Sequence, residues 1–338
     1  MKPLSAPVKV SVDITDRCTL KCSHCRLGGR EFSGEPLAFG TLCEVLDDLV
    51  AMKVFRLGVS GGEPFLRHDL EAIVEYALQA GIPRVFISTN GTLMSGGRLA
   101  ALRRFHDRIT FKTSIDGPRR IHDEVRGAAG AFQAASEGIG ALRKEGFEVH
   151  VTTTLTKLTA AYLPETLRLV GTLGCSRHYV VEVIPTGRAS PDAVMTPEER
   201  KEAGKTIRQE TPRLRRAGYE LVAKIPFLEG TRFGFECCAG ASECGVMSDG
   251  LITGCRLLPD VHEGYVQDSH LSAVWRSREG FAYFRRELPG RLGAPCQGCK
   301  ALARCRGGCR ACAVRTWGRE EGPDPRCPRA ASYAGSLH

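Results

Sequence analysis

Six short apolar stretches, rich in β-branched residues, alternate with amphipathic stretches along the first two thirds of the chain. Short β-branched runs bounded by turn residues predict strands, and apolar residues spaced three and four positions apart predict helices that bury one face. The predicted strands cover residues 8–14, 54–60, 84–89, 109–115, 148–155 and 178–184, and the clearest helices cover 42–52, 70–80 and 163–173.

This alternation of strand and helix predicts an α/β fold in which parallel strands carry helices on their outer face. Six units fall short of the eight that close a TIM barrel, so we expect a partial (β/α)6 TIM-like barrel over residues 1–225. Chemistry in such barrels lies at the carboxyl ends of the strands. A smaller, cysteine-rich domain follows over residues 226–338.

The composition indicates a compartment and excludes some partners. The chain has 338 residues, of which 42% are hydrophobic, and it contains neither a run of 18 apolar residues nor a signal-peptide segment. We therefore expect a cytoplasmic protein without a membrane partner. In that reducing compartment, 15 cysteines favour metal ligation over disulfides.

The net charge of +9 is concentrated near the C-terminus. Residues 251–338 hold 14 Arg or Lys against 8 Asp or Glu, which contributes +6 of the total. Thiolate-ligated metal sites are anionic, so basic side chains among the cysteines would balance them locally. No basic stripe with interleaved aromatic residues accompanies the charge, and we expect no nucleic-acid partner.

Three cysteines follow the first predicted strand in the spacing C-x3-C-x2-C: Cys18, Cys22 and Cys25. A cubane iron–sulfur cluster normally takes four thiolates, so three leave one iron open to bind another ligand. The alternative is a zinc site with His24 as a fourth ligand, but zinc prefers closed sets of four donors in paired knuckles. The motif therefore favours cluster chemistry.

This motif resembles the signature of the radical S-adenosylmethionine (SAM) superfamily. In that family the open iron binds the amino and carboxylate groups of SAM, and one electron from the cluster cleaves SAM to a 5'-deoxyadenosyl radical. The resemblance implies that Cys18, Cys22 and Cys25 ligate a [4Fe-4S] cluster and are catalytic. It also implies SAM as a cofactor.

Later strand ends carry residues suited to a polar, zwitterionic ligand. Gly61, Gly62 and Glu63 form a Gly-Gly-Glu-Pro turn that resembles the segment with which the family binds the amino group of SAM. The same resemblance implies SAM contacts for four further residues, each of which could instead cap a turn or lie in solvent: Ser88, Asn90, Ser114 and Arg126.

The C-terminal cysteines are spaced C-x11-G-x4-C, then C-x2-C-x5-C-x3-C, then C, with one more inside the first interval. This pattern resembles the SPASM domain of radical SAM enzymes, which holds two auxiliary [4Fe-4S] clusters and would bring the total to three. By that resemblance, one cluster is held by Cys238, Cys244, Cys255 and Cys309, and the other by Cys296, Cys299, Cys305 and Cys327.

Several details of this domain stay open. Two zinc sites are the alternative to two clusters, since zinc ribbons use similar knuckles. Residues 246–252 predict a β-hairpin that would bring Cys244 and Cys255 together. Cys237 and Cys312 are surplus; we expect structural thiols, although Cys237 adjoins a ligand and could replace one.

The resemblance implies oxidative attack on a substrate C–H bond, and the leading hypothesis is maturation of a ribosomally synthesised precursor peptide (RiPP). Arg256 follows Cys255 where sulfatase-maturing relatives carry an acidic base, which counts against formylglycine formation and suggests an anchor for a substrate carboxylate or hydroxyl. The rival is small-molecule oxidation, either of a sugar or aminocyclitol alcohol or of a tetrapyrrole side chain. A non-enzymatic electron-transfer or zinc-scaffold protein is the third alternative.

Electrons must come from a partner, because no flavin or nicotinamide fingerprint is present. We expect a ferredoxin or flavodoxin to dock on the basic cysteine-rich domain, near Arg306 and Arg310. Only about seven residues precede the first strand. A peptide substrate would then need direct docking or a separate leader-peptide recognition protein.

Overall fold

The fold is given by a computed structural model of the chain, which describes residues 3–28, 35–94, 96–227, 237–286 and 291–334. Its centre is one ten-stranded sheet in the order β10-β9-β8-β1-β2-β3-β4-β5-β6-β7. The first seven strands are parallel neighbours in chain order: β1 (Lys9–Asp13), β2 (Arg56–Ser60), β3 (Arg84–Ser88), β4 (Ile109–Ser114), β5 (Glu148–Leu155), β6 (Arg177–Glu182) and β7 (Glu220–Lys224).

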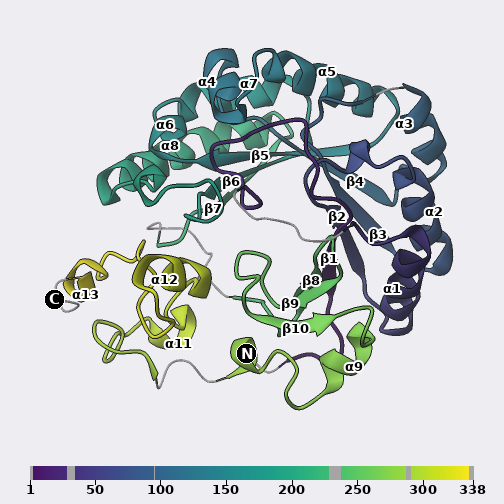
Figure 1. Ribbon diagram of the computed structural model, residues 1–338. Helices are drawn as coiled ribbons and strands as arrows, with labels where there is room; N and C mark the ends of the chain where they lie inside the picture. Colours follow the sequence, from purple (N-terminus) through teal and green to yellow (C-terminus); the bar gives the residue numbers. More distant parts are fainter. Residues whose placement is uncertain (1–2, 29–34, 95, 228–236, 287–290, 335–338) are drawn as a thin grey trace.

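Helices cover the outer face of this curved sheet (Figure 1), and side chains on its inner face, the lumen side of the barrel, line a cavity. They are α1 (Phe39–Ala51), α2 (Leu70–Ala80), α3 (Gly96–Leu102), α4 (Arg119–Arg126), α5 (Ala131–Lys144), α6 (Lys157–Ala160), α7 (Leu163–Thr172) and α8 (Pro197–Arg216). Strands β7 and β10 are the two ends of the sheet and do not pair with each other. The predicted partial barrel is therefore confirmed.

All six predicted strands are present, with bounds that shift by at most two residues at either end. The structure adds β7, a seventh parallel strand that the pattern did not predict. Its sequence, ELVAK, is short and mostly polar at its ends, and every residue of it is at least partly exposed. It is held by pairing with β6 over five residues, a tertiary contact that a periodicity search cannot detect.

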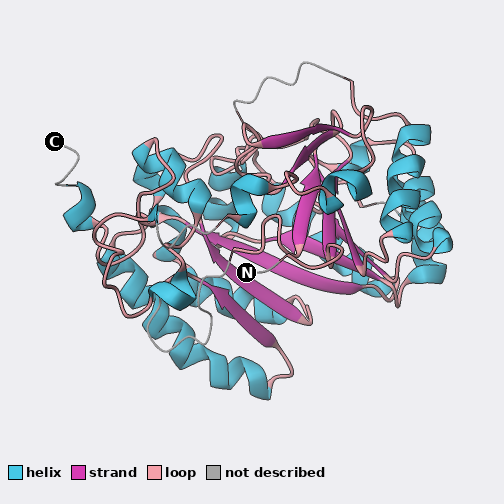
Figure 2. Cartoon of the chain, turned by 90° about the horizontal axis from the view of Figure 1, so that it is seen from below, coloured by secondary structure: helices cyan, strands magenta, loops and turns pink. Residues whose placement is uncertain are grey.

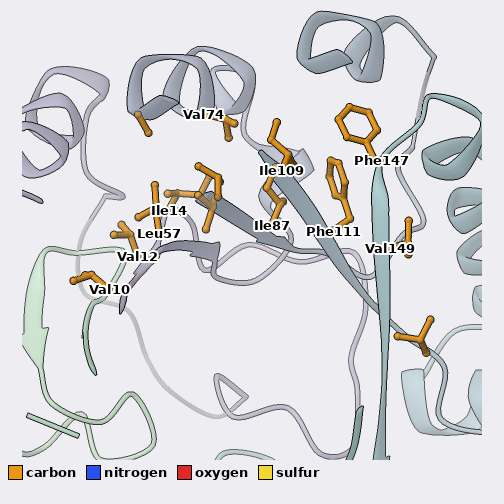
Figure 3. Close-up of a cluster of buried hydrophobic side chains, with 14 of the residues drawn as sticks. Val10, Val12, Ile14, Leu57, Val74, Ile87, Ile109, Phe111, Phe147 and Val149 are labelled. Carbon is orange, nitrogen blue, oxygen red and sulfur yellow. The ribbon is translucent and has the colours of Figure 1, made fainter. Parts of the chain in front are cut away.

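The largest core lies between the sheet and the outer helices. Successive side chains of a strand point to opposite faces of the sheet. Val10, Val12 and Ile14 therefore face the helices together with Leu57 and Ile87 from the next strands (Figure 3). Phe111 packs edge to face on Phe147, with ring centroids 5.0 Å apart. This layer leaves the opposite face of each strand to line the lumen.

The C-terminal segment extends the sheet past β1 before it forms helices. Strand β8 (Glu243–Val246) pairs in parallel with β1, and the hairpin to β9 (Leu251–Thr253) and then β10 (His262–Tyr265) is antiparallel, as predicted. Short helices follow: α9 (Leu271–Arg276), α10 (Ala282–Arg285), α11 (Leu302–Cys305), α12 (Arg310–Trp317) and α13 (Ala331–Ala334).

Helix α9, which carries Trp275, ties the C-terminal segment to the barrel. The indole Nε1 of Trp275 donates to the Leu4 carbonyl at 2.9 Å, and the Ser272 amide donates to Asp48 of α1 at 2.8 Å. Because β8 pairs with β1, the strands of both parts belong to one sheet, and Figure 2 shows how strongly the strands twist. The division at residues 225 and 226 stays a prediction about folding units.

In the described part of the chain, every helix is either too short or too polar to cross a bilayer.

Candidate functional site

The three cysteines of the first motif lie in the loop that leaves the carboxyl end of β1. This loop is held by backbone bonds to distant segments: the Ser23 amide donates to the Val125 carbonyl at 2.8 Å, and the Arg188 amide donates to the Cys25 carbonyl at 3.0 Å. Cys18, Cys22 and Cys25 all line one cavity of about 440 Å³ at the mouth of the barrel. Their placement at the strand ends agrees with the prediction.

A buried ion pair stands behind Cys22. Arg126 Nη2 lies 2.6 Å from Asp116 Oδ2, and Arg126 Nη1 donates to the Cys22 sulfur at 3.6 Å. Burial alone would raise the pKa of Asp116, but the charge of Arg126 outweighs it and holds that pKa below its usual value. Arg126 therefore supplies a positive charge to both a carboxylate and a cysteine sulfur.

Without a metal the first two cysteines are thiols. Burial raises the pKa of Cys18, and it raises the pKa of Cys22 in spite of the opposing charge of Arg126. Iron binds the thiolate, so loading this site must release protons.

The Gly-Gly-Glu turn after β2 packs against the cysteine loop. The Gly62 amide donates to the Thr15 carbonyl at 2.7 Å, and the Glu63 amide donates to the Arg17 carbonyl at 2.8 Å. A Cβ atom on Gly61 would lie 2.0 Å from the Thr15 carbonyl oxygen. The glycines are thus needed so that two backbone segments can meet, as the sequence suggested, although here the partner is the chain itself.

The side chain of Glu63 is fully buried beside this turn. Its carboxylate accepts from the Phe65 amide at 3.0 Å, the Thr89 hydroxyl at 2.7 Å and the Asn90 amide at 2.7 Å. Burial raises the pKa of Glu63 in spite of these donors. Its carboxylate fixes the end of β3, and a role in binding an ammonium group stays a prediction.

The remaining predicted contacts surround the same cavity. Gly61, Gly62, Ser88, Asn90, Ser114 and Arg126 line it together with the three cysteines. Asn90 Nδ2 donates to the Thr19 hydroxyl at 3.0 Å and lies 3.9 Å from the Cys18 sulfur. Polar donors and acceptors from four strand ends thus converge on a cavity that also exposes three thiols, which suits an iron–sulfur cluster and a zwitterionic ligand.

Residues 12–170 match the model of the radical SAM superfamily. An AdoMet-dependent heme synthase from Methanosarcina barkeri is 30% identical over 88% of this chain and 93% of its own length. The chain belongs to the radical SAM superfamily. Enzymes of this family use SAM and a [4Fe-4S] cluster, and the residues around the cavity fit both groups.

Two further radical SAM comparisons extend over the C-terminal part. The mycofactocin maturase MftC of Mycolicibacterium smegmatis is 27% identical over 96% of this chain and 83% of its own length. The crystal structure of Streptococcus suis SuiB bound to S-adenosylmethionine has a TM-score of 0.78 at 18% identity, covering 96% of this chain and 78% of that one. The prediction of a radical SAM enzyme with a SPASM-type C-terminal domain is confirmed.

In this radical SAM enzyme, four C-terminal cysteines form one group. The thiols of Cys299, Cys305 and Cys327 each add to the rise that burial causes in the pKa of Cys296. Cys327 and Cys299 act on Cys305 in the same way. The four residues predicted for the second auxiliary cluster therefore lie within electrostatic range of one another. In the described part of the chain no three His, Cys, Asp or Glu side chains converge closely enough to hold a single metal ion, so their ligation of a cluster stays a prediction.

The other predicted set is only partly assembled. Cys255 and Cys309 lie in one small apolar cluster with Leu258, and Cys237 lies within electrostatic range of both and of Cys238. Cys244 is buried in the main barrel core instead, because β8 pairs with β1 and places Cys244 opposite Val10. The predicted hairpin forms, but its two cysteines lie in different apolar clusters.

A second cavity of about 450 Å³ adjoins the first and shares Arg26 and Thr186 with it. Arg256 and Arg315 also line it. Arg256 Nη1 lies 2.5 Å from Asp13 Oδ1, and Arg26 Nη2 lies 2.8 Å from Asp13 Oδ2. Arg256 is thus neither a free anchor nor a solvated side chain: one of its donors is committed to Asp13, and its predicted catalytic role stays a prediction.

The sequence reasoning did not find Asp13, Arg26 or Arg315. The only signal for Asp13 in the sequence was its position at the end of a strand, with a side chain expected to point to the inner face. Several other residues share this property, so it did not single out Asp13. One expectation about docking is wrong: Arg310 is only 4% exposed, and it donates to the carbonyls of Gly307 and Gly322. Arg310 therefore organises the loop between cysteines and cannot meet an electron carrier.

Proposed function

We propose that this radical SAM enzyme oxidises a carboxylate-bearing side chain of a tetrapyrrole. One observation carries this: Arg26, Arg256 and Arg315 line a cavity that shares Arg26 and Thr186 with the cavity of the three cysteines. Two carboxylates pair with these three arginines, Asp13 with Arg26 and Arg256 and Asp260 with Arg315, which leaves one net positive charge for a substrate carboxylate. Guanidinium groups bind carboxylates in a planar, bidentate geometry. The relative from Methanosarcina barkeri is named a heme synthase, which supports this substrate class.

The protein's own groups divide the work between the two cavities. Cys18, Cys22 and Cys25 would hold the cluster that, when loaded, supplies the electron for SAM cleavage and hence the hydrogen-abstracting fragment. Arg126 balances charge behind Cys22, and Asn90 orients the loop next to Cys18. Arg26 and Arg256, held in place by Asp13, would orient the substrate carboxylate.

Two auxiliary clusters complete the proposal. Cys296, Cys299, Cys305 and Cys327 are grouped in a way that supports one of them. The other would use Cys238, Cys255 and Cys309, with either Cys237 or Cys244 as the fourth ligand. A one-electron carrier such as a ferredoxin or flavodoxin would supply electrons.

The test is anaerobic reconstitution with iron and sulfide, followed by incubation with SAM, dithionite and iron-coproporphyrin III, which carries four propionate side chains. We expect about twelve iron atoms per chain and 5'-deoxyadenosine release that the tetrapyrrole stimulates. The tetrapyrrole product should be lighter, because conversion of a propionate to a vinyl group would pass one hydrogen atom to 5'-deoxyadenosine and one electron to an auxiliary cluster and would release the carboxyl group as carbon dioxide. Cys22→Ala should abolish all 5'-deoxyadenosine. Tetrapyrrole that neither changes mass nor stimulates 5'-deoxyadenosine release would overturn the proposed substrate.

A second candidate, modification of a precursor peptide, is favoured by the similarity to the mycofactocin maturase MftC. The carboxylate would then belong to the peptide, at its C-terminus or on an acidic side chain. The same assay with peptides encoded beside the gene distinguishes the two, because only the true substrate should stimulate 5'-deoxyadenosine release and change mass.

A further inference from the structure

Cationic and aromatic side chains alternate in one row across the inner face of the barrel. The row runs through Arg56 on β2, Phe86 on β3, Lys112 on β4, Tyr179 on β6 and Lys224 on β7. Arg56 lies 4.7 Å and Lys112 lies 4.9 Å from the centroid of the Phe86 ring. Lys112 lies 5.6 Å and Lys224 lies 5.1 Å from the centroid of the Tyr179 ring. We call these five residues the cation–aromatic row.

No carboxylate among the described residues pairs with the three cations of the row. Arg56 Nε is buried without a hydrogen-bond partner, and Lys112 and Lys224 form no ion pair there. The carboxylates nearby are engaged elsewhere: Glu243 lies 2.8 Å from Lys9, Glu148 lies 2.8 Å from His150, and Glu220 lies 2.6 Å from Arg177.

The cations of the row also repel one another. Burial, with the charges of Lys9, Lys224 and Arg56, lowers the pKa of Lys112 to about 8. Burial and the charge of Lys9 lower the pKa of Lys224 as well. The charge of Glu243 opposes both shifts without reversing them. Like charges held together in a partly buried lumen are unfavourable, so the arrangement is suited to receive an anion.

The row meets the cavity of the three cysteines at one of its residues, Lys112. Lys112 lines the same 440 Å³ cavity as the three N-terminal cysteines, and its strand neighbour Ser114 lies nearer the mouth. A ligand that reaches from the cysteine loop toward the floor of this cavity would therefore meet the Lys112 ammonium group. Phe86 and Tyr179 add flat apolar surface on either side of it.

We propose that the cation–aromatic row binds carboxylate groups of the substrate, deep in the barrel and apart from the arginines of the second cavity. The substrate class is then a flat molecule with at least two carboxylates on different edges. This rests on the proposed function only for the choice of a tetrapyrrole. The binding of a polycarboxylate by the row does not depend on that choice.

The test measures binding to the reconstituted enzyme with two probes: coproporphyrin III, followed by its fluorescence, and mellitate, a benzene with six carboxylates, followed by calorimetry. The variants are Lys112→Gln, Lys112→Arg, and Lys144→Gln as a control that removes the same charge from the outer helix α5. Melting temperature and iron content verify that each variant is folded and loaded.

We expect Lys112→Gln to weaken both probes about tenfold or more, as loss of one charge-assisted hydrogen bond does. Lys112→Arg should recover most of the affinity, and Lys144→Gln should stay within about twofold of wild type. Equal affinity of wild type and Lys112→Gln for both probes would overturn the inference.

The two proposals fail separately. If mellitate binding depends on Lys112 but the enzyme turns over no tetrapyrrole, the row is an anion site and the proposed substrate is wrong. If wild type and Lys112→Gln bind both probes and turn over the tetrapyrrole equally well, the proposed function stands and the row plays no part in it.

Discussion

Replacing Arg126 by Met is the sharpest test of how the chain builds its N-terminal cluster site. The guanidinium is 9% exposed and Asp116 is fully buried, with 2.6 Å between Nη2 and Oδ2. Removing one partner of such a pair leaves an uncompensated buried charge and costs about 3–5 kcal/mol of stability. The same change removes the donor that lies 3.6 Å from the Cys22 sulfur.

The size of the effect should depend on pH with a defined sign. In the wild type the pKa of Asp116 is lowered, so the stability it contributes is present above the ordinary carboxyl range and is lost as the pH falls. In Arg126→Met the largest charge that opposes burial is gone, so the pKa of Asp116 rises relative to the wild type, although His24, His122 and the Thr154 amide still lower it. The destabilisation should therefore be larger at pH 7.5 than at pH 5.5, where protonation relieves the unpaired carboxylate.

Urea unfolding of the metal-free protein at these two pH values measures the loss. Arg103→Met is the matched control, because Arg103 is 68% exposed and lies 3.7 Å from Glu145, an arrangement that contributes less than about 1 kcal/mol. The double variant Arg126→Met, Asp116→Leu should regain most of the stability. An Arg126→Met protein as stable as Arg103→Met at pH 7.5 would refute the reasoning.

Three further outcomes follow from the site. After the same reconstitution time, more iron should be bound at pH 8.5 than at pH 6.5. Burial raises the pKa of Cys18 and Cys22, and iron must displace the protons of these thiols. An iron assay that finds equal loading at the two pH values contradicts this prediction. Cys244→Ala should keep the iron content of the wild type, whereas Cys237→Ala should lower it. Of these two cysteines, Cys237 is the one that lies within electrostatic range of Cys255 and Cys309, while Cys244 is buried in the main core. If instead Cys244→Ala lowers the iron content and Cys237→Ala does not, Cys244 is the ligand. Affinity for mellitate should fall as the pH rises through about 8, because Lys112 loses its proton there, and this fall should be smaller in Lys112→Gln. The other groups that face Lys112 are Lys9, Arg56, Lys224, Glu243 and His150. The pKa of Lys224 is also lowered, so Lys224 accounts for any fall that persists in the variant, whereas burial lowers the pKa of His150 below this range. An equal fall in wild type and Lys112→Gln would contradict the role of Lys112.

The sequence was sufficient to predict the barrel, because the relevant signals are local. Alternation within each strand and helical spacing between strands are properties of short segments, so residues 148–155 were assigned with the bounds that the structure has. The end of the sheet was not predictable in this way. Strand β7 is recognisable only through its five-residue pairing with β6, which lies more than 40 residues away in the chain.

The same distinction between local and long-range information applies to the cysteines. Spacing within the loop predicted that Cys18, Cys22 and Cys25 act together, and all three line one cavity. Their ligation of a cluster stays a prediction. The placement of Cys244 depends on a contact between β8 and β1, which no spacing contains. A thiol that alternation turns toward Val10 becomes part of the core, whereas its neighbour Glu243 turns the other way and pairs with Lys9.

The lumen charges show why a long-range arrangement can carry more functional information than a motif. Lys9, Arg56, Lys112 and Lys224 stand on four strands, and each would pass alone for an ordinary surface cation. Parallel strands in chain order bring them to one inner face, where their charges lower the pKa of Lys112 together. Repulsion of this kind lowers the stability of the folded enzyme when no anion is bound. The arrangement is therefore explained if the enzyme works with an anion in the lumen, and the mellitate titration tests whether it does.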